Sequence, residues 1–271
     1  MKKIDKSVIS KIREYRRQGN SFKQIAQTLD LSPATAYKYS KDIKVSVRRK
    51  TTPKKKVKIP TKITRNLVRI IGHCMFDGSV FESKKDYIIR YTNSSKEEVN
   101  KFVEDMWETF RLLPTSVIKR KGKYIDWFEA TFSSKKVFDF LHNFAISFST
   151  ISETGFREEF LSLLSKNLKI ELLRTFWCDE GSVAKDGKIV GKSKSLRIIH
   201  QLKNLHESLG IKTSIWRDNT SKIYGLYTKK NKRNIKLFSK IGFGNGIVTR
   251  GKFIGLKKNK VLVKLYGPVI S

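Results

Sequence analysis

Cysteines and long apolar runs are scarce in this sequence. The only cysteines, Cys74 and Cys178, both lie inside apolar stretches. Two cysteines are too few for a disulfide-stabilised scaffold, and neither belongs to a CxxC pair or a His/Cys cluster that would indicate zinc. We interpret both as small buried hydrophobic residues in a reducing compartment. No apolar run has the length of a membrane span, and the N-terminal residues lack the apolar core of a secretion signal.

Acidic residues are also scarce. The 271 residues include 58 Lys and Arg but only 24 Asp and Glu, which gives a formal net charge of +34. Self-repulsion of this size is tolerated most easily by a protein that binds a polyanion. Nucleic acid is the first candidate partner and an anionic membrane surface the second, although a generally Lys-rich proteome would also raise the charge. The cysteine usage predicts a reducing, intracellular location, either cytoplasmic or in the nucleoid.

Residues 1–43 are expected to form a small all-α domain of three helices. Ser21 and Gln24 have the spacing of a capping box, and Ser32 followed by Pro33 is a typical start for the third helix. The pattern resembles the helix-turn-helix of resolvases and many repressors, whose second motif helix lies in the major groove. The resemblance implies DNA contacts from four side chains: Ser32, Thr35, Tyr37 and Lys38. A three-helix domain that binds protein is the alternative.

Residues 44–62 contain nine Lys and Arg, two prolines and no acidic residue. The stretch lacks an amphipathic period, so we expect an extended basic linker. Segments of this composition commonly follow phosphates or enter a minor groove, which makes Arg48 and Arg49 candidate DNA contacts. A solvated spacer or a nuclear localisation signal would have a similar composition.

The stretch at residues 64–80 has a second copy at residues 168–183. Both are apolar helical runs, and they end in Asp77 and Glu180, each followed by Gly-Ser-Val. Gly72 lies in the middle of the first run, where glycine costs about 1 kcal/mol relative to alanine. A helix retains such a glycine where another backbone must approach closely.

The same order of elements is predicted after each run: two strands, a helix, two strands and a helix. Gly78 is expected to end the first helix in a left-handed conformation. The matching order divides the chain into a repeat at residues 63–155 and a second at residues 156–271. Residues 242–271 have no counterpart and no clear assignment. The sequence therefore predicts an α+β fold.

Both runs resemble the motif of LAGLIDADG homing endonucleases, and the resemblance covers residues 63–245. It implies a pseudo-twofold duplicated αββαββα fold in one monomeric chain, whose antiparallel sheets form a saddle over DNA. It also implies that Gly72 and its counterpart Thr175 pack the two motif helices together. Asp77 and Glu180 would then be the catalytic residues.

The sequence departs from the family motif at two places. Met75 and Cys178 occupy the sixth motif position, which is often aspartate. In the second copy Asp179 directly precedes Glu180, so the catalytic carboxylate is ambiguous there. Alignment on Gly181 favours Glu180.

A carboxylate at the C-terminal end of a helix lies at the negative end of the helix dipole. Two such ends side by side would repel each other unless a divalent cation lay between them, and oxygen ligands favour Mg²⁺. The resemblance thus implies hydrolysis of both strands of double-stranded DNA at a long recognition site, with Asp77 and Glu180 holding Mg²⁺. A nearby lysine often assists in the family, and Lys135 and Lys229 are the candidates.

Basic residues on or beside the predicted strands are further candidate DNA contacts. Side chains that alternate along a strand can read base edges, while lysines in loops hold phosphates. The candidates are Arg90, Lys119, Arg120, Lys123, Arg217, Lys222 and Lys229.

Two alternatives to a nuclease stay open. Some bacterial transcription regulators join a degenerate LAGLIDADG domain to a helix-turn-helix and do not cut DNA. The presence of both motif carboxylates favours the nuclease over such a regulator. An intron-splicing maturase keeps the fold and binds RNA, and nothing in the sequence excludes it.

Overall fold

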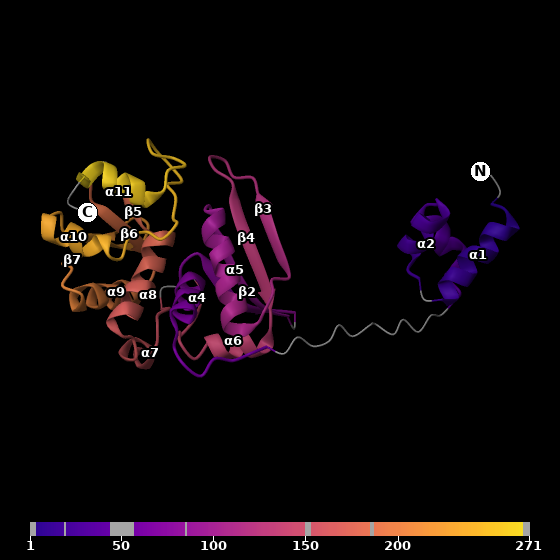
Figure 1. Cartoon of the computed structure of the whole chain (residues 1–271), viewed down its shortest axis with the longest axis horizontal. Helices are drawn as coiled ribbons and strands as arrows, with labels where there is room; N and C mark the ends of the chain where they lie inside the picture. Colours follow the sequence, from indigo (N-terminus) through magenta and orange to yellow (C-terminus); the bar gives the residue numbers. More distant parts are fainter. Residues whose placement is uncertain are drawn as a thin grey trace. The chain divides into compact units, whose positions relative to one another are not determined.

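The computed structural model describes residues 4–18, 20–43, 57–84, 86–149, 153–184 and 187–267. The chain divides into two compact units, Met1–Lys54 and Lys55–Ser271 (Figure 1). Arg48 and Arg49, the candidate contacts in the basic linker, lie outside the described residues. Over the described ranges, no helix combines the length and the apolar character needed to cross a lipid bilayer.

In the first unit, the described residues form three short helices: α1 (Lys6–Arg17), α2 (Phe22–Leu29) and α3 (Pro33–Ser40). The backbone N–H of Gln24 donates to the Ser21 hydroxyl, and the Gln24 side chain accepts from the N–H of Ser21, as the predicted capping box requires. Ser32 caps α3 and Pro33 is its first residue. One buried side chain from each helix forms the centre of the core: Ile12, Ile25 and Ala36.

The second unit contains one arrangement of helices and strands twice. Its first half consists of α4 (Arg65–Met75), β1 (Gly78–Ser83), β2 (Asp86–Asn93), α5 (Lys96–Phe110), β3 (Ser116–Arg120), β4 (Trp127–Ser133) and α6 (Lys135–Leu141). A short helix α7 (Glu158–Ser162) leads into the second half. This half consists of α8 (Lys166–Asp179), β5 (Ser182–Val183), β6 (Ile189–Ser193), α9 (Leu196–Ser208), β7 (Thr213–Asp218), β8 (Ile223–Thr228) and α10 (Lys232–Ser239). A further helix, α11 (Lys258–Tyr266), follows.

Each half forms an antiparallel sheet of four strands with the same topology. The strand orders are β1-β2-β4-β3 and β5-β6-β8-β7. In the first sheet α5 packs against β2 and β4 (Figure 1). In the second, α9 packs against β6, β7 and β8. Alternate side chains such as Ile89 and Tyr91 on β2 are buried beneath the helices. The mixed α+β fold with two antiparallel sheets is therefore confirmed.

The two halves meet where α4 packs against α8. A Cβ atom added to Gly72 would lie 2.0 Å from Thr175 Oγ1, so a side chain on Gly72 would collide with α8. The Thr175 hydroxyl donates to the carbonyl oxygen of Leu172 (2.7 Å), which satisfies this polar group in the buried interface. Apolar side chains of both helices belong to one continuous core.

The predicted left-handed helix end at Gly78 is wrong. α4 ends at Met75, and Gly78 is the first residue of β1, with no positive φ angle. Glycine is required there for a different reason. An added Cβ would lie 2.7 Å from the carbonyl oxygens of His73 and Arg90, because β2 passes directly over the end of α4.

Candidate active site

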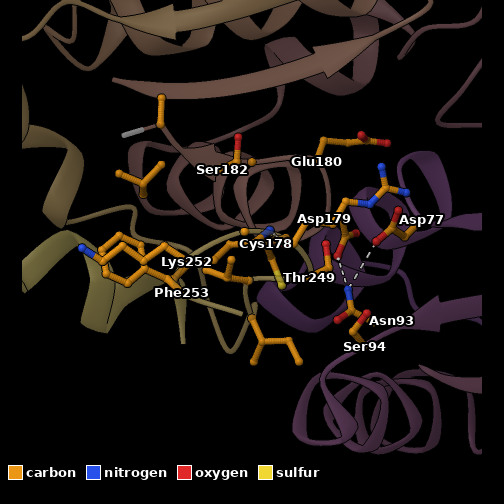
Figure 2. A pocket seen from close by; sticks show the side chains of 18 of the residues that line it. Asp77, Asn93, Ser94, Cys178, Asp179, Glu180, Ser182, Thr249, Lys252 and Phe253 are labelled. Atoms are coloured by element: carbon orange, nitrogen blue, oxygen red, sulfur yellow. Dashed lines mark hydrogen bonds between the residues drawn. The ribbon is translucent and has the colours of Figure 1, made fainter. Parts of the chain in front are cut away.

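Asp77 and Glu180 follow equivalent helices and line the same pocket. Asp77 lies two residues after the last residue of α4, and Glu180 is the C-cap of α8. Each precedes a glycine without space for a side chain, since a Cβ on Gly181 would lie 2.4 Å from the carbonyl oxygen of Trp177. The packed helices bring both carboxylates to a pocket of about 710 Å³ (Figure 2).

Both carboxylates are destabilised in their ionised form. Asp77 is open to solvent at the pocket, yet the protein atoms that crowd its carboxyl, and then the charges of Asp179 and Glu180, raise its pKa well above the usual value. Burial and then Asp179 raise the pKa of Glu180 to about 7, and Lys258 opposes this shift. Within the described part of the chain, neither carboxylate forms an ion pair. A bound cation would relieve this repulsion.

The Asp179 carboxylate, by contrast, interacts with polar side chains of the protein itself. Its carboxylate oxygens lie 2.8 Å from His73 Nδ1, 2.8 Å from the Tyr91 hydroxyl and 3.1 Å from Asn93 Nδ2. The Asp179 side chain is completely buried. Asp179 also lines the pocket, but these contacts already occupy its carboxylate, whereas Glu180, the C-cap of α8, has no such partners among the described residues.

His73 links Asp179 to the first half of the unit. Its Nε2 lies 3.2 Å from Glu98 Oε1, so the imidazole ring is placed between two carboxylates. Burial alone would lower the pKa of His73, but Asp179 and Glu98 raise it to about 10. Although burial opposes the change, the charged ring helps to lower the pKa of Glu98 to about 2. This buried row of alternating charges fixes the end of α8 against α4 and α5.

Asn93 connects the buried network to the pocket. Its Nδ2 lies 3.3 Å from Asp77 Oδ2 as well as 3.1 Å from Asp179 Oδ1 (Figure 2). Its Oδ1 accepts from the backbone N–H of Ser95 (2.9 Å), which fixes the orientation of the amide. Asn93 therefore orients the Asp77 carboxylate.

The C-terminal segment, which had no assignment from sequence, forms another wall of the pocket. Residues 247–253 and Lys258 line it. The buried Lys258 Nζ donates to the carbonyl oxygen of Cys178 (2.5 Å) and so places a cation at the negative end of α8. One signal could have indicated this arrangement. Lys258, Val261 and Leu262 have the spacing of one helix face, and all three are buried.

The donor set at the pocket fits a divalent cation that is shared with a substrate. Across the described residues, no group of three or more His, Cys, Asp and Glu side chains could enclose a metal ion. Of the three carboxylates that line the pocket, Asp179 is paired with His73, which leaves Asp77 and Glu180, without an ion pair to any described residue, in an open site. Mg²⁺ is commonly held through one or two carboxylates, with water and substrate phosphates completing its shell.

The first sheet presents two of the candidate DNA contacts on its face away from the helices. Arg90 on β2 and Arg120 on β3 share this face with Glu129, whose oxygens lie 3.9 Å and 3.3 Å from them. Lys119 alternates to the other face of β3, where it pairs with Asp126 (2.7 Å).

In the second sheet, basic side chains lie on both faces. Arg217 lies on the same side of β7 as Ile215, which packs on the core, and its guanidinium lies over the Tyr224 ring. Lys192 on β6, which sequence reasoning missed, lies on the opposite face, with its ammonium 5.4 Å from the centre of the Trp216 ring. Basic and aromatic residues are mixed along the strands of both sheets. The sequence alone therefore does not show on which face a basic residue lies, and the strand register is needed to assign it.

The remaining candidates lie in connections and in the first unit. Lys123 lies in the β3–β4 connection and Lys222 in the β7–β8 turn. Neither Lys135 nor Lys229 is among the described residues that line the carboxylate pocket, and Lys135 pairs with Asp139 (3.4 Å). These basic groups are therefore placed away from Asp77 and Glu180.

Ser32 is the N-cap of α3 in the first unit, and its hydroxyl accepts a hydrogen bond from the Thr35 N–H (3.1 Å). Tyr37 and Lys38 are exposed on the same helix. Both can therefore contact a partner, whereas the Ser32 hydroxyl already serves the helix.

Residues 167–242 match the family model of the LAGLIDADG-like domain. No curated protein sequence is significantly similar to the chain. The structure of the homing endonuclease I-DmoI in complex with DNA and Mn is 15% identical, with a TM-score of 0.50 over 68% of this chain and 98% of that chain. A second I-DmoI complex, with target DNA nicked in the coding strand, is 16% identical, with a TM-score of 0.50 over 65% and 94%. Full-length DUF199/WhiA from Thermatoga maritima is 14% identical, with a TM-score of 0.46 over 68% and 57%. Residues 167–242 thus resemble a LAGLIDADG-like domain, and the fold of the second unit is similar to that of I-DmoI.

Proposed function

We propose that the protein is a site-specific homing endonuclease that cuts both strands of DNA by cation-dependent hydrolysis of phosphodiester bonds. The observation that carries this proposal is the meeting of Asp77 and Glu180 at one pocket, at the ends of two packed helices. Carboxylates at the centre of a DNA-binding surface repel phosphates. A protein that only bound DNA would gain nothing from them, whereas a nuclease uses them to hold metal ions.

Asp77 and Glu180 would hold the divalent cations, and Mg²⁺ is the expected ion because the pocket carboxylates supply only oxygen ligands. Cations held there would supply a lowered pKa for the attacking water and compensation for negative charge on the phosphoryl group and the leaving oxygen. Asn93 orients Asp77, and Lys258 holds the end of α8 that carries Glu180. The I-DmoI complex with DNA and Mn supports a cation and DNA as ligands of this fold.

Double-stranded DNA is the proposed partner, with a long recognition site along both sheets. Arg90, Arg120 and Lys192 lie on sheet faces that the packed helices leave open, beside aromatic side chains. The exposed Tyr37 and Lys38 of α3 would add contacts outside the cut site. Because one chain carries both carboxylates, a monomer suffices for two cuts.

A selection followed by a cutting assay tests the proposal even though the target sequence is unknown. The full chain is first used in EDTA to select bound duplexes from a randomised library. The selected duplex is then incubated with protein and either Mg²⁺ or EDTA. We expect a double-strand break at one position in Mg²⁺ and none in EDTA.

Two other outcomes would indicate a different function. Tight, sequence-specific binding without a break in Mg²⁺ or Mn²⁺ would refute the nuclease and favour a DNA-binding regulator. If no duplex were selected, the same assay with structured intron RNA would test the maturase.

A further inference from the structure

A loop near the C-terminus is anchored to both halves of the second unit. We call residues 247–257 the C-terminal loop. Immediately before it, the N–H of Asn245 donates to Glu98 Oε2 (2.9 Å), and at its end Lys257 Nζ lies 2.5 Å from Glu97 Oε2. Lys258 then binds the carbonyl oxygen of Cys178 on α8. Both ends of the loop are thus held beside the carboxylate pocket.

The loop is closed across its base. Ile247 and Lys257 form an antiparallel bridge, and the N–H of Val248 donates to the carbonyl oxygen of Leu256 (2.9 Å). Gly251 has a φ angle of 84° and no other part of the protein within 4 Å of the position of a Cβ, as expected at a turn that projects into solvent. The C-terminal loop is therefore a projection with a fixed base.

The tip of the loop carries Arg250 and Lys252, one on each side of Gly251. Both are exposed and both line the pocket that contains Asp77 and Glu180. In the part of the chain that the structure describes, neither has a hydrogen bond or ion pair. Figure 2 places Lys252 across the pocket from Asp77. Two cations beside several carboxylates, yet paired with none, are available to a different anion.

We propose that the C-terminal loop is an arm that binds the sugar–phosphate backbone of duplex DNA next to the carboxylate pocket, through Arg250 and Lys252. The proposal rests on the proposed function for the identity of the partner, but it does not require cleavage. Its position across the pocket suits phosphates that flank the reacting one. Anchoring at Glu97, Glu98 and α8 fixes the arm relative to both halves, so its contacts would also set the position of the duplex over Asp77 and Glu180.

The test compares the salt dependence of DNA binding between the wild type and Arg250→Ala/Lys252→Ala. Binding of a fluorescent 40-bp duplex of mixed sequence is measured by anisotropy in EDTA, so no cutting is involved. Each phosphate contact contributes about 0.9 to the slope of log K against log salt. Loss of two contacts should reduce the slope by about 1.8. The factor by which affinity falls between 50 and 200 mM salt should then be about 12 times smaller in the variant than in the wild type.

The matched control is Lys236→Ala/Lys240→Ala, on α10 and at its C-cap, which removes the same charge at two exposed lysines that do not line the pocket. Its slope should change by less than about 0.5. Thermal melting should show that both double variants fold like the wild type. An unchanged slope in the arm variant, or equal changes in both variants, would overturn the proposal. If the wild type binds but never cuts, the proposed function fails while the arm is still tested.

Discussion

Replacing Glu180 with glutamine should stabilise the metal-free protein above neutral pH. The pKa of Glu180 is raised from 4.5 to about 7 in the folded chain. Between these values the folded state keeps a proton that the unfolded state has released, so the free energy of unfolding falls as pH rises through this window. At 1.36 kcal/mol per pKa unit the full penalty is about 3 kcal/mol. Because some solvent reaches this side chain, we expect about 1–3 kcal/mol.

Urea unfolding followed by tryptophan fluorescence measures this effect. All four tryptophans, at positions 107, 127, 177 and 216, belong to the second unit, so the signal reports the unit that carries the site. In EDTA at pH 8, Glu180→Gln should unfold at higher urea than the wild type. At pH 4 the two should be alike, because the wild-type carboxyl is then largely protonated in the unfolded as well as the folded chain.

The control is Glu82→Gln, at an exposed glutamate on β1. In a chain with a net charge of +34, loss of an ordinary carboxylate should leave stability unchanged or slightly lower it. Added Mg²⁺ should stabilise the wild type at pH 8 more than Glu180→Gln. If Glu180→Gln were no more stable than the wild type at pH 8, the claim of a destabilised carboxylate at the pocket would be refuted.

Two further substitutions test the helix pair and the buried network. Gly72→Ala should lower the free energy of unfolding by about 1–3 kcal/mol, because its Cβ would collide with Thr175, and adding Thr175→Gly should restore part of the loss. A wild-type urea midpoint in Gly72→Ala would contradict the close approach. Asp179→Asn should cost about 3–5 kcal/mol, because it removes one of the two carboxylates beside the buried imidazolium, and should lower the pKa of His73 from about 10. An NMR titration in which the His73 pKa stayed unchanged would show that Asp179 does not control it.

The helices and strands could largely be predicted because their signals are local. Ser21 with Gln24 and Ser32 with Pro33 each mark a helix start within a few residues of sequence, and both caps are present. The repeated carboxylate–Gly–Ser–Val ending indicated the duplication for the same reason. Gly78 was the exception, since its requirement for glycine comes from β2 rather than from its own helix.

The buried charge network could not be predicted because its members are distant in sequence. Asp179 is 106 residues from His73 and 86 from Asn93, and the contacts exist only once the two halves have packed. The sequence repeat does not extend to this network, because the first half has no carboxylate at the position that corresponds to Asp179. Phe76 occupies the equivalent place in the first half and packs against Phe156 and Phe176, so one side of the pseudo-symmetric site is ionic and the other aromatic.

The C-terminal wall of the site also escaped sequence reasoning, because no matching segment follows the first repeat. Residues 242–267 reach the pocket through long-range contacts such as Asn245 with Glu98, 147 residues apart. The expected assisting lysines, Lys135 and Lys229, were chosen from the repeat pattern, whereas the basic residues that line the pocket include Arg250, Lys252 and Lys258.

Cleavage by carboxylate variants shows whether Asp77 and Glu180 are catalytic. A selected duplex, labelled separately on each strand, is incubated in Mg²⁺ with saturating wild type, Asp77→Asn, Glu180→Gln or the control Asp139→Asn, which changes an exposed aspartate on α6. We expect double-strand cleavage by the wild type and the control, and none by either pocket variant, with DNA affinity largely kept. Cleavage at the wild-type rate by Asp77→Asn or by Glu180→Gln would contradict this expectation.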